Sequence, residues 1–300
     1  VLIYPSGLSP FGEDVAVHHY LDWKADILFT LKDAWVFDLL PSWALNWCPI
    51  VPIDHEHVSP SITARLHTTF KNIAISRHGQ RELKQQGIDS TYVPHGVRTD
   101  VYKPLEDKAA CRKLFFLEPD DFVIGIVALN RVRKMIPQML RGYKRFLELN
   151  PDVRAHLFLW TDIQPGGPAT EDLPGVSDVG VNLLPEIVEL GIANAPNDVR
   201  WFSPNEWKKL MDMGGLPEWD PRGGWDMVKL YNSFSVLLLC SGGEGFGLPL
   251  IEAQACMPNG EKIVTVAGPE QVGAGLTVPY NDYVILNTPG TRYAVPDVDR

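Results

Sequence analysis

Two carboxylates in one short segment have a spacing and a setting that suit the binding of a phosphorylated sugar. Glu244 and Glu252 lie in residues 241–255, which read SGGEGFGLPLIEAQA. The preceding apolar run, residues 235–240, has the length of a buried parallel strand. Glycines allow a tight turn and a close approach to a ligand, and the helix expected from Gly247 would attract phosphate at its N-terminus. The segment therefore predicts a phosphate and sugar site.

The two carboxylates differ in how easily they are explained without a ligand. Glu244 stands at the helix entrance, where a negative charge is favourable in any protein. Glu252 shares a helical stripe with Leu248, Ala255 and Cys256, a face that otherwise reads as buried. A buried charge is costly unless it is paired or hydrogen-bonded, so we expect a polar partner such as ligand hydroxyls. The alternative is an ordinary strand, turn and capped helix without a ligand.

A second segment carries a cluster of cations. Arg131, Arg133 and Lys134 follow the apolar run of residues 122–128, which predicts a strand. Cations at the carboxyl end of a parallel strand face the crevice where α/β folds bind ligands. They would supply the positive charge that a departing nucleoside diphosphate needs, although a solvated basic turn before a helix is the alternative.

A third polar segment, residues 52–57, reads PIDHEH after a short apolar strand. His55 and His57 would share one side if the strand continued, but two histidines without a third ligand make a weak zinc site. Asp54 and Glu56 have the spacing of an acidic metal-binding motif, but the sequence around them does not have the pattern of the fold in which that motif occurs. We therefore expect no metal site, and a solvated polar turn remains an alternative here.

The segment EGFGLPLIEA, which starts at Glu244, resembles the retaining GT-B glycosyltransferases of family 4, in which it reads E-G-F-G-L-P-x-x-E-A. The resemblance implies that Glu244 meets the donor sugar and that Glu252 holds the ribose of the nucleotide. It also implies that backbone N–H groups of the turn face the sugar and the diphosphate. The donor-binding residues expected here are Gly245, Phe246, Gly247, Leu248 and Glu252.

The same resemblance extends to the other two polar segments. Lys134 matches a lysine that grips the donor phosphates, whereas Leu129 stands where the family has an arginine, for which Arg131 or Arg133 could substitute. In the family a polar residue at the end of the earlier strand approaches the transferred sugar, which makes Asp54 or His55 the candidate.

One more segment completes the resemblance. Residues 92–97, YVPHGV, look like the I-P-H-G-V-D segment that ends the family's first domain. His95 would then face the interdomain cleft, although a lone histidine is more often structural.

Strand and helix patterns alternate along the whole chain, which favours parallel α/β layers. With the resemblance, this predicts a GT-B-like α/β fold of two Rossmann-like parallel-sheet domains facing a cleft, the N-terminal one incomplete. We expect a partial acceptor-side domain at 1–105 and a nucleotide-sugar-binding domain at 106–300, joined through the charged, irregular stretch of residues 98–121. Strands are expected at 26–31, 50–53, 72–76, 91–94, 122–128, 155–160, 199–202, 235–240 and 263–266. Helices are expected at 14–23, 78–87, 136–149 and from 247.

The ends and loops of the chain carry further expectations. Residues 1–4 read as a buried strand, and residues 293–300 read as the approach to a further helix. We therefore expect a chain truncated at both ends relative to the resembling family. Residues 165–180 predict a Pro- and Gly-rich surface loop, and residues 257–262 lengthen the turn before the strand at 263–266.

Composition excludes several classes of partner. The net charge of −10 over 300 residues argues against nucleic acid. No window approaches the ~20 apolar residues that a membrane-spanning helix needs. The four cysteines show neither paired metal spacing nor a disulfide framework, which favours the reducing cytoplasm. Homo-oligomer formation stays open.

Together these features predict a retaining, metal-independent, hexosyltransferase-like enzyme without a cofactor. It would move a sugar from a UDP- or GDP-sugar to an unknown glycan, lipid or small-molecule acceptor. The alternative is a catalytically impaired remnant that binds nucleotide sugars, because Leu129 has lost a cation and part of the first domain is missing. A nicotinamide-dependent oxidoreductase is disfavoured, since no G-x-G-x-x-G follows an early strand.

Overall fold

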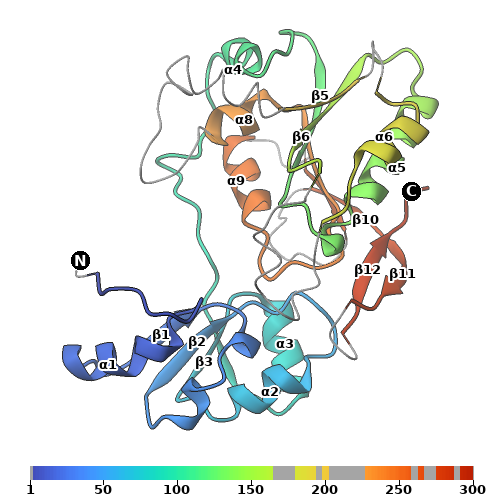
Figure 1. Cartoon of the computed structure of the whole chain (residues 1–300). Helices are drawn as coiled ribbons and strands as arrows, with labels where there is room; N and C mark the ends of the chain where they lie inside the picture. Colours follow the sequence, from blue (N-terminus) through green and yellow to red (C-terminus); the bar gives the residue numbers. More distant parts are fainter. Residues whose placement is uncertain are drawn as a thin grey trace. The chain divides into compact units, whose positions relative to one another are not determined.

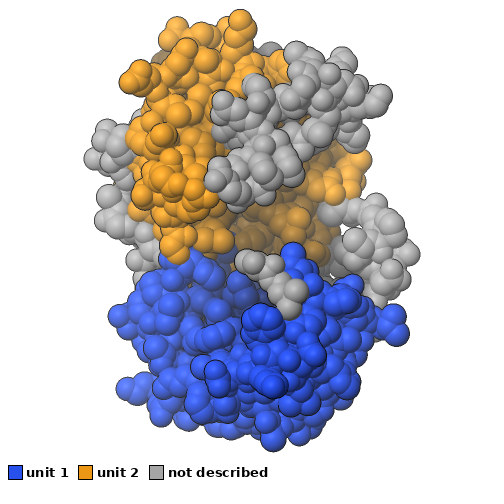
Figure 2. Space-filling model, turned by 90° about the vertical axis from the view of Figure 1, so that its left-hand side faces the viewer, with its two compact units in different colours: residues 1–95, 244–246, 288–293 blue, residues 96–243, 247–287, 294–300 orange. Residues whose placement is uncertain are grey.

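The computed structural model describes residues 3–164, 180–193, 198–202, 227–257, 263–266, 275–286 and 291–299. The chain forms two compact units, coloured separately in Figure 2. The first unit consists of residues 1–95, 244–246 and 288–293, and the second of residues 96–243, 247–287 and 294–300.

The first unit contains a parallel sheet of four strands in the order β1-β2-β3-β4 (Figure 1). Its strands are β1 (Leu28–Leu31), β2 (Trp47–Val51), β3 (Asn72–Ala74) and β4 (Ser90–Tyr92). Its helices are α1 (Glu13–Trp23), η1 (Ala34–Val36), η2 (Leu40–Ser42), α2 (Pro60–Leu66) and α3 (Arg77–Gln85). Ser59 and Ser76 cap α2 and α3 by accepting backbone N–H groups, as short hydroxyl side chains commonly do at helix starts.

The second unit contains a parallel sheet of six strands in the order β10-β9-β8-β5-β6-β7. Its strands are β5 (Phe122–Val127), β6 (Ala155–Trp160), β7 (Val199–Trp201), β8 (Val236–Leu239), β9 (Ile263–Val266) and β10 (Leu276–Val278). Its helices are α4 (Lys108–Leu114), η3 (Val132–Lys134), α5 (Ile136–Leu149), α6 (Leu184–Glu189), α8 (Met227–Ser233) and α9 (Leu248–Cys256). A separate two-stranded sheet pairs β11 (Tyr280–Val284) with β12 (Tyr293–Pro296).

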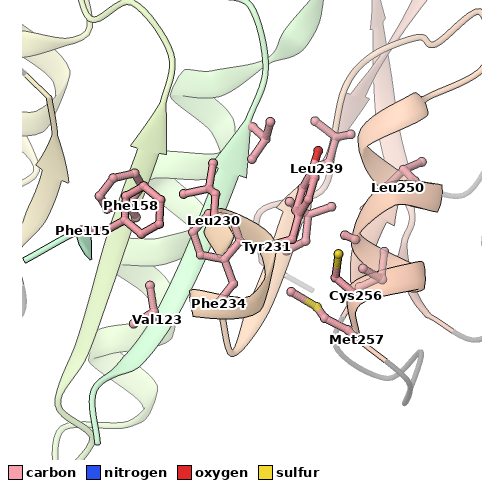
Figure 3. Packing of buried hydrophobic residues seen from close by; sticks show 14 of the residues in the cluster. Phe115, Val123, Phe158, Leu230, Tyr231, Phe234, Leu239, Leu250, Cys256 and Met257 are labelled. Atoms are coloured by element: carbon pink, nitrogen blue, oxygen red, sulfur yellow. The ribbon is translucent and has the colours of Figure 1, made fainter. Parts of the chain in front are cut away.

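Apolar side chains cover both faces of the six-stranded sheet. On one face α8 and α9 contribute Leu230, Tyr231, Leu250 and other buried residues to a cluster that Figure 3 shows from close by. On the other face α5 and α6 supply a second buried cluster. A parallel sheet buried on both faces explains why its strands read as continuous apolar runs.

The predicted α/β fold with parallel sheets is confirmed, and α5 and β6 have the predicted bounds. The strand expected at residues 1–4 is wrong where the structure describes it, because Ile3 is 86% exposed and residues 3 and 4 lie in no strand. The predicted irregular connection of residues 98–121 contains α4. Residues 165–179 of the predicted loop, and residues 258–262 of the lengthened turn, lie outside the described ranges.

Candidate functional site

The glycine-rich turn leads from the carboxyl end of β8 into α9. Gly247 precedes the helix with φ 85° and ψ 56°, a left-handed conformation that a residue without Cβ adopts at little cost. Gly247 at the N-cap has no side chain and therefore makes no cap hydrogen bond to the first N–H groups of α9. The start of α9 is therefore suited to an anion such as phosphate.

Residues 244–246 of this turn belong to the first unit. A Cβ on Gly245 would lie 2.8 Å from the Cβ of Pro52, so glycine is needed for this close approach. Phe246 is buried, and its ring meets the ring of His95 edge to face with centroids 5.2 Å apart. The sequence singled out His95, but it did not predict this aromatic contact.

The cation cluster and the glycine-rich turn are joined within the second unit. The Arg133 guanidinium donates to the carbonyl of Gly243 at 3.1 Å, and the N–H of Gly242 donates to the carbonyl of Arg133 at 2.8 Å. Arg133 and Lys134 lie in η3, directly after Arg131. Arg133 therefore helps to fix the path of the turn through its contacts with Gly242 and Gly243.

A cavity of about 900 Å³ lies at the carboxyl ends of β5, β6 and β7. Leu129, from the cation segment, and Pro249, from the first turn of α9, both line it. Trp160, Asp162 and Trp201 contribute aromatic surface and one carboxylate. Leu129 is 63% exposed, so an apolar side chain faces solvent where the resembling family has an arginine.

Glu252 has its polar partner inside the protein. Its Oε2 accepts a hydrogen bond of 2.7 Å from the hydroxyl of Tyr231, which is fully buried. Burial, and then the charge of Glu252 and the hydrogen bond to it, raise the pKa of Tyr231 well above its usual value. The hydroxyl thus stays protonated and donates to the carboxylate.

Burial, and then the charge of Glu252 and a hydrogen bond to it, also raise the pKa of Tyr102 above its usual value. Leu248 is 41% exposed, so the apolar stripe expected around Glu252 is buried at Cys256 but not at Leu248. Sequence reasoning missed both tyrosines, since nothing local links them to a carboxylate on another helix.

Asp54 and His55 form a hydrogen-bonded pair in the first unit. Their Oδ1 and Nδ1 atoms are 2.9 Å apart, and the hydroxyl of Tyr293 donates to the same oxygen of Asp54 at 3.5 Å. His55 is 7% exposed, and its Nε2 has no hydrogen-bond partner among the described residues. His57 is exposed and adopts φ 60°, so the strand does not continue to bring the two histidines onto one side.

The expected site residues divide between the units. The first unit contains Asp54, His55, Glu244, Gly245 and Phe246, and the second contains Arg131, Arg133, Lys134, Gly247, Leu248 and Glu252.

Within the described ranges, no cluster of three or more His, Cys, Asp or Glu side chains could hold a metal ion. None of the helices described is both long and apolar enough to cross a membrane.

No protein-family model matches the chain. It is 27% identical over 166 residues to the D-inositol 3-phosphate glycosyltransferase of Stackebrandtia nassauensis, a match that covers 55% of this chain and 31% of that protein. It is 30% identical over 197 residues to the enzyme of the same name from Kribbella flavida, covering 65% and 38%. The chain therefore spans about a third of the length of the curated relatives it matches.

Solved structures show a similar fold. A glycosyltransferase from Rickettsia africae superposes with a TM-score of 0.60 at 14% identity, covering 94% of this chain and 71% of that one. Anabaena HepE in complex with UDP-glucose gives 0.60 at 16% identity, covering 91% and 70%. Sucrose-phosphate synthase from Thermosynechococcus elongatus gives 0.58 at 17% identity, covering 90% and 64%. The two parallel sheets and these likenesses identify the architecture of the chain as the GT-B fold.

Proposed function

We propose that the chain is a retaining, metal-independent glycosyltransferase of the family 4 type, hexosyltransferase-like, that takes its sugar from a UDP- or GDP-sugar. The observation that carries the proposal is the cavity of the second unit, because Leu129 of the cation segment and Pro249 of the segment after the glycine-rich turn both line it. The names of the curated relatives and the UDP-glucose bound to HepE support a nucleotide-sugar donor.

The charges of the second unit suit a diphosphate leaving group. Lys134, with Arg131 and Arg133, supplies cations, and the start of α9 adds N–H groups and the positive end of its dipole. Donors arranged in advance stabilise charge that develops in the transition state, which is usually the largest part of catalysis. Glu252 binds the ribose, and Glu244 orients the donor sugar together with the backbone of residues 245–248.

The first unit offers groups for the transferred sugar. We propose that residues 1–105 form the acceptor-side domain and residues 106–300 the donor domain. Asp54 and His55 are hydrogen-bonded at 2.9 Å, and the Asp54 side chain, which is 19% exposed, is the polar group of this pair that a sugar hydroxyl would meet. All four cysteines are buried as thiols, which supports the proposed location in the reducing cytoplasm.

A titration series tests the donor site directly. Calorimetry with UDP, GDP, ADP and their glucose or mannose conjugates should reveal saturable binding of one nucleoside diphosphate. Glu252→Gln, which removes the charge and keeps the size, should weaken that binding. If no nucleoside diphosphate binds, or if Glu252→Gln binds with unchanged affinity, the assignment of this site is wrong.

A catalytically impaired nucleotide-sugar-binding protein is the second candidate. The exposed Leu129 favours it, because the cavity has an apolar side chain where a cation would neutralise phosphate. The chain is incubated with the nucleotide sugar that it binds, and mass spectrometry of the mixture then shows whether the sugar has been released or transferred. Release or transfer of the sugar supports the enzyme, whereas an intact donor with unchanged binding supports the remnant.

A further inference from the structure

The carboxylate of Glu252 is held by a donor that comes from another helix. Tyr231 lies on α8, among buried apolar side chains that Figure 3 shows beside Leu250 and Cys256 of α9. Its hydroxyl donates to Glu252 Oε2 at 2.7 Å, and its side chain is 0% exposed. A fully packed ring has little freedom to rotate, so this hydrogen bond restricts the position of the carboxylate.

A second tyrosine approaches the same carboxylate. The pKa of Tyr102 is raised by burial, by the charge of Glu252 and by a hydrogen bond to it, and the rings of Tyr102 and Tyr231 have centroids 6.2 Å apart. Asn232 fixes the segment that carries Tyr102: its side chain donates to the carbonyl of Lys103 at 3.0 Å and accepts from the N–H of Leu105 at 2.9 Å. Two adjacent residues of α8 therefore act together. Tyr231 binds the Glu252 carboxylate, and Asn232 holds the segment that carries Tyr102.

Neutral hydroxyl donors have a specific consequence for Glu252. A carboxylate has two oxygens with about four acceptor sites, and the hydrogen bond from Tyr231 occupies only one of them. Because a tyrosine hydroxyl donates without a formal positive charge, the carboxylate keeps its negative charge for a further donor. Hydrogen bonds to a charged acceptor are about twice as strong as those between neutral groups.

We propose that Tyr231, assisted by Tyr102, is a positioning residue that directs the Glu252 carboxylate toward the ribose hydroxyls of a nucleoside diphosphate. The inference rests on the proposed function of this site. The competing explanation is that the tyrosines only satisfy a partly buried carboxylate and contribute to stability alone. The two explanations differ in whether ligand affinity depends on the ribose.

The variant Tyr231→Phe removes the hydroxyl and keeps the packed ring. Calorimetry should compare UDP, 2′-deoxy-UDP and inorganic pyrophosphate, or the corresponding set for whichever nucleotide binds. We expect about a tenfold loss of affinity for the ribonucleotide, a smaller loss for the deoxynucleotide and no change for pyrophosphate. In the double variant with Glu252→Gln, the loss should not exceed that of Glu252→Gln alone.

Tyr143→Phe is the matched control. Tyr143 is 1% exposed, and its hydroxyl donates to the carbonyl of Ala155 at 2.8 Å in the cluster on the other face of the sheet. This variant loses a buried hydrogen bond of similar geometry but should keep all three affinities. If Tyr231→Phe does not fold, Tyr102→Phe, at a partly buried position, takes its place in the same titrations.

The outcomes separate this inference from the proposed function. Unchanged affinity of Tyr231→Phe for the ribonucleotide, or an equal loss for pyrophosphate, overturns the positioning role while the donor site stands. Failure of the unaltered chain to bind any nucleoside diphosphate overturns both. A selective loss for the ribonucleotide, absent in Tyr143→Phe, supports the inference.

Discussion

At the scale of single residues, the sequence located polar groups more successfully than it located their partners. Glu252 has a polar partner as expected, but this partner is the hydroxyl of Tyr231, and Leu248 of the expected buried stripe is exposed. Tyr231 itself was not predicted, because the contact joins two helices and depends on how α8 packs against α9. The roles assigned to Glu244, Lys134, Asp54 and His55 stay predictions.

Lys134 provides a residue-scale prediction about charge. Lys134→Ala should weaken binding of the nucleoside diphosphate by about 1.5–3 kcal/mol, because a charged hydrogen bond to phosphate is lost, and should leave nucleoside binding unchanged. Calorimetric titration of both ligands measures the difference. Lys144→Ala is the control, since Lys144 lies on α5 and forms an exposed pair with Glu148 at 3.8 Å. An equal loss for diphosphate and nucleoside would point instead to a structural role.

At the scale of helices and strands, prediction worked where local pattern and packing agree. Both α5 and β6 have the predicted bounds, because α5 has a clear periodicity with Pro137 at its start and Asn150 at its end, and β6 is a mostly apolar run. β2 begins at Trp47 rather than Ile50, since its internal Pro49 reads as a strand breaker while the strand is fixed by pairing on both sides.

The helix α4 was missed for a different reason. It is short and lies in a charged stretch, where hydrophobic periodicity gives no signal. Long-range contacts stabilise it: the Arg112 side chain donates to the carbonyl of Ser233 at 3.0 Å and to the hydroxyl of Ser235 at 3.1 Å. Contacts more than 100 residues apart in sequence cannot be derived from local composition.

Gly247 provides an element-scale prediction. Gly247→Ala should destabilise the chain by about 1–2 kcal/mol, because φ 85° is unfavourable for a residue with Cβ, and should weaken nucleotide binding by shifting the start of α9. Urea unfolding and calorimetry measure the two effects. Gly142→Ala, in α5 with open space around the new Cβ, should instead stabilise by about 0.5–1 kcal/mol. Equal stability of the Gly247 variant and the unaltered chain would contradict the argument.

The amino ends of three strands are linked by a buried histidine, which leads to a stability prediction. His156 of β6 is 1% exposed and hydrogen-bonds Asp198 before β7 through Nδ1. Its Nε2 lies 3.2 Å from Asp121, before β5, without hydrogen-bond geometry. His156→Leu should cost about 1–3 kcal/mol, because Asp198 loses a hydrogen bond, although Arg200 still binds Asp198 and the N–H of Glu118 still binds Asp121.

Urea unfolding measures this loss. The exposed His67 serves as the control, since His67→Leu should change stability by less than about 0.5 kcal/mol. Equal stabilities of the two variants would show that the contacts of His156 carry no net energy.

At the scale of the whole molecule, each unit has its own parallel sheet and its own buried cluster. The alternation of strands and helices predicted this α/β organisation correctly. It could not predict that residues 244–246 and 288–293 belong to the first unit, because such membership depends on contacts between segments far apart in sequence. The glycine-rich turn is therefore divided between the two units by its contacts, although it is continuous in sequence.

This division leads to a prediction about where a ligand adds stability. A nucleoside diphosphate at 100 times its Kd should stabilise the state that binds it by about 2.7 kcal/mol. Since Lys134, Gly247 and Glu252 belong to the second unit, and chains of two units need not unfold in one step, the gain should be local. Amide hydrogen exchange measured with and without the nucleotide should therefore slow at β8 and α9, and much less at α2 and α3. Glu252→Gln should remove most of this protection at the same ligand concentration, because occupancy falls. Protection confined to α2 and α3, with β8 and α9 unchanged, would place the nucleotide site in the first unit and contradict the assignment of the donor-binding residues.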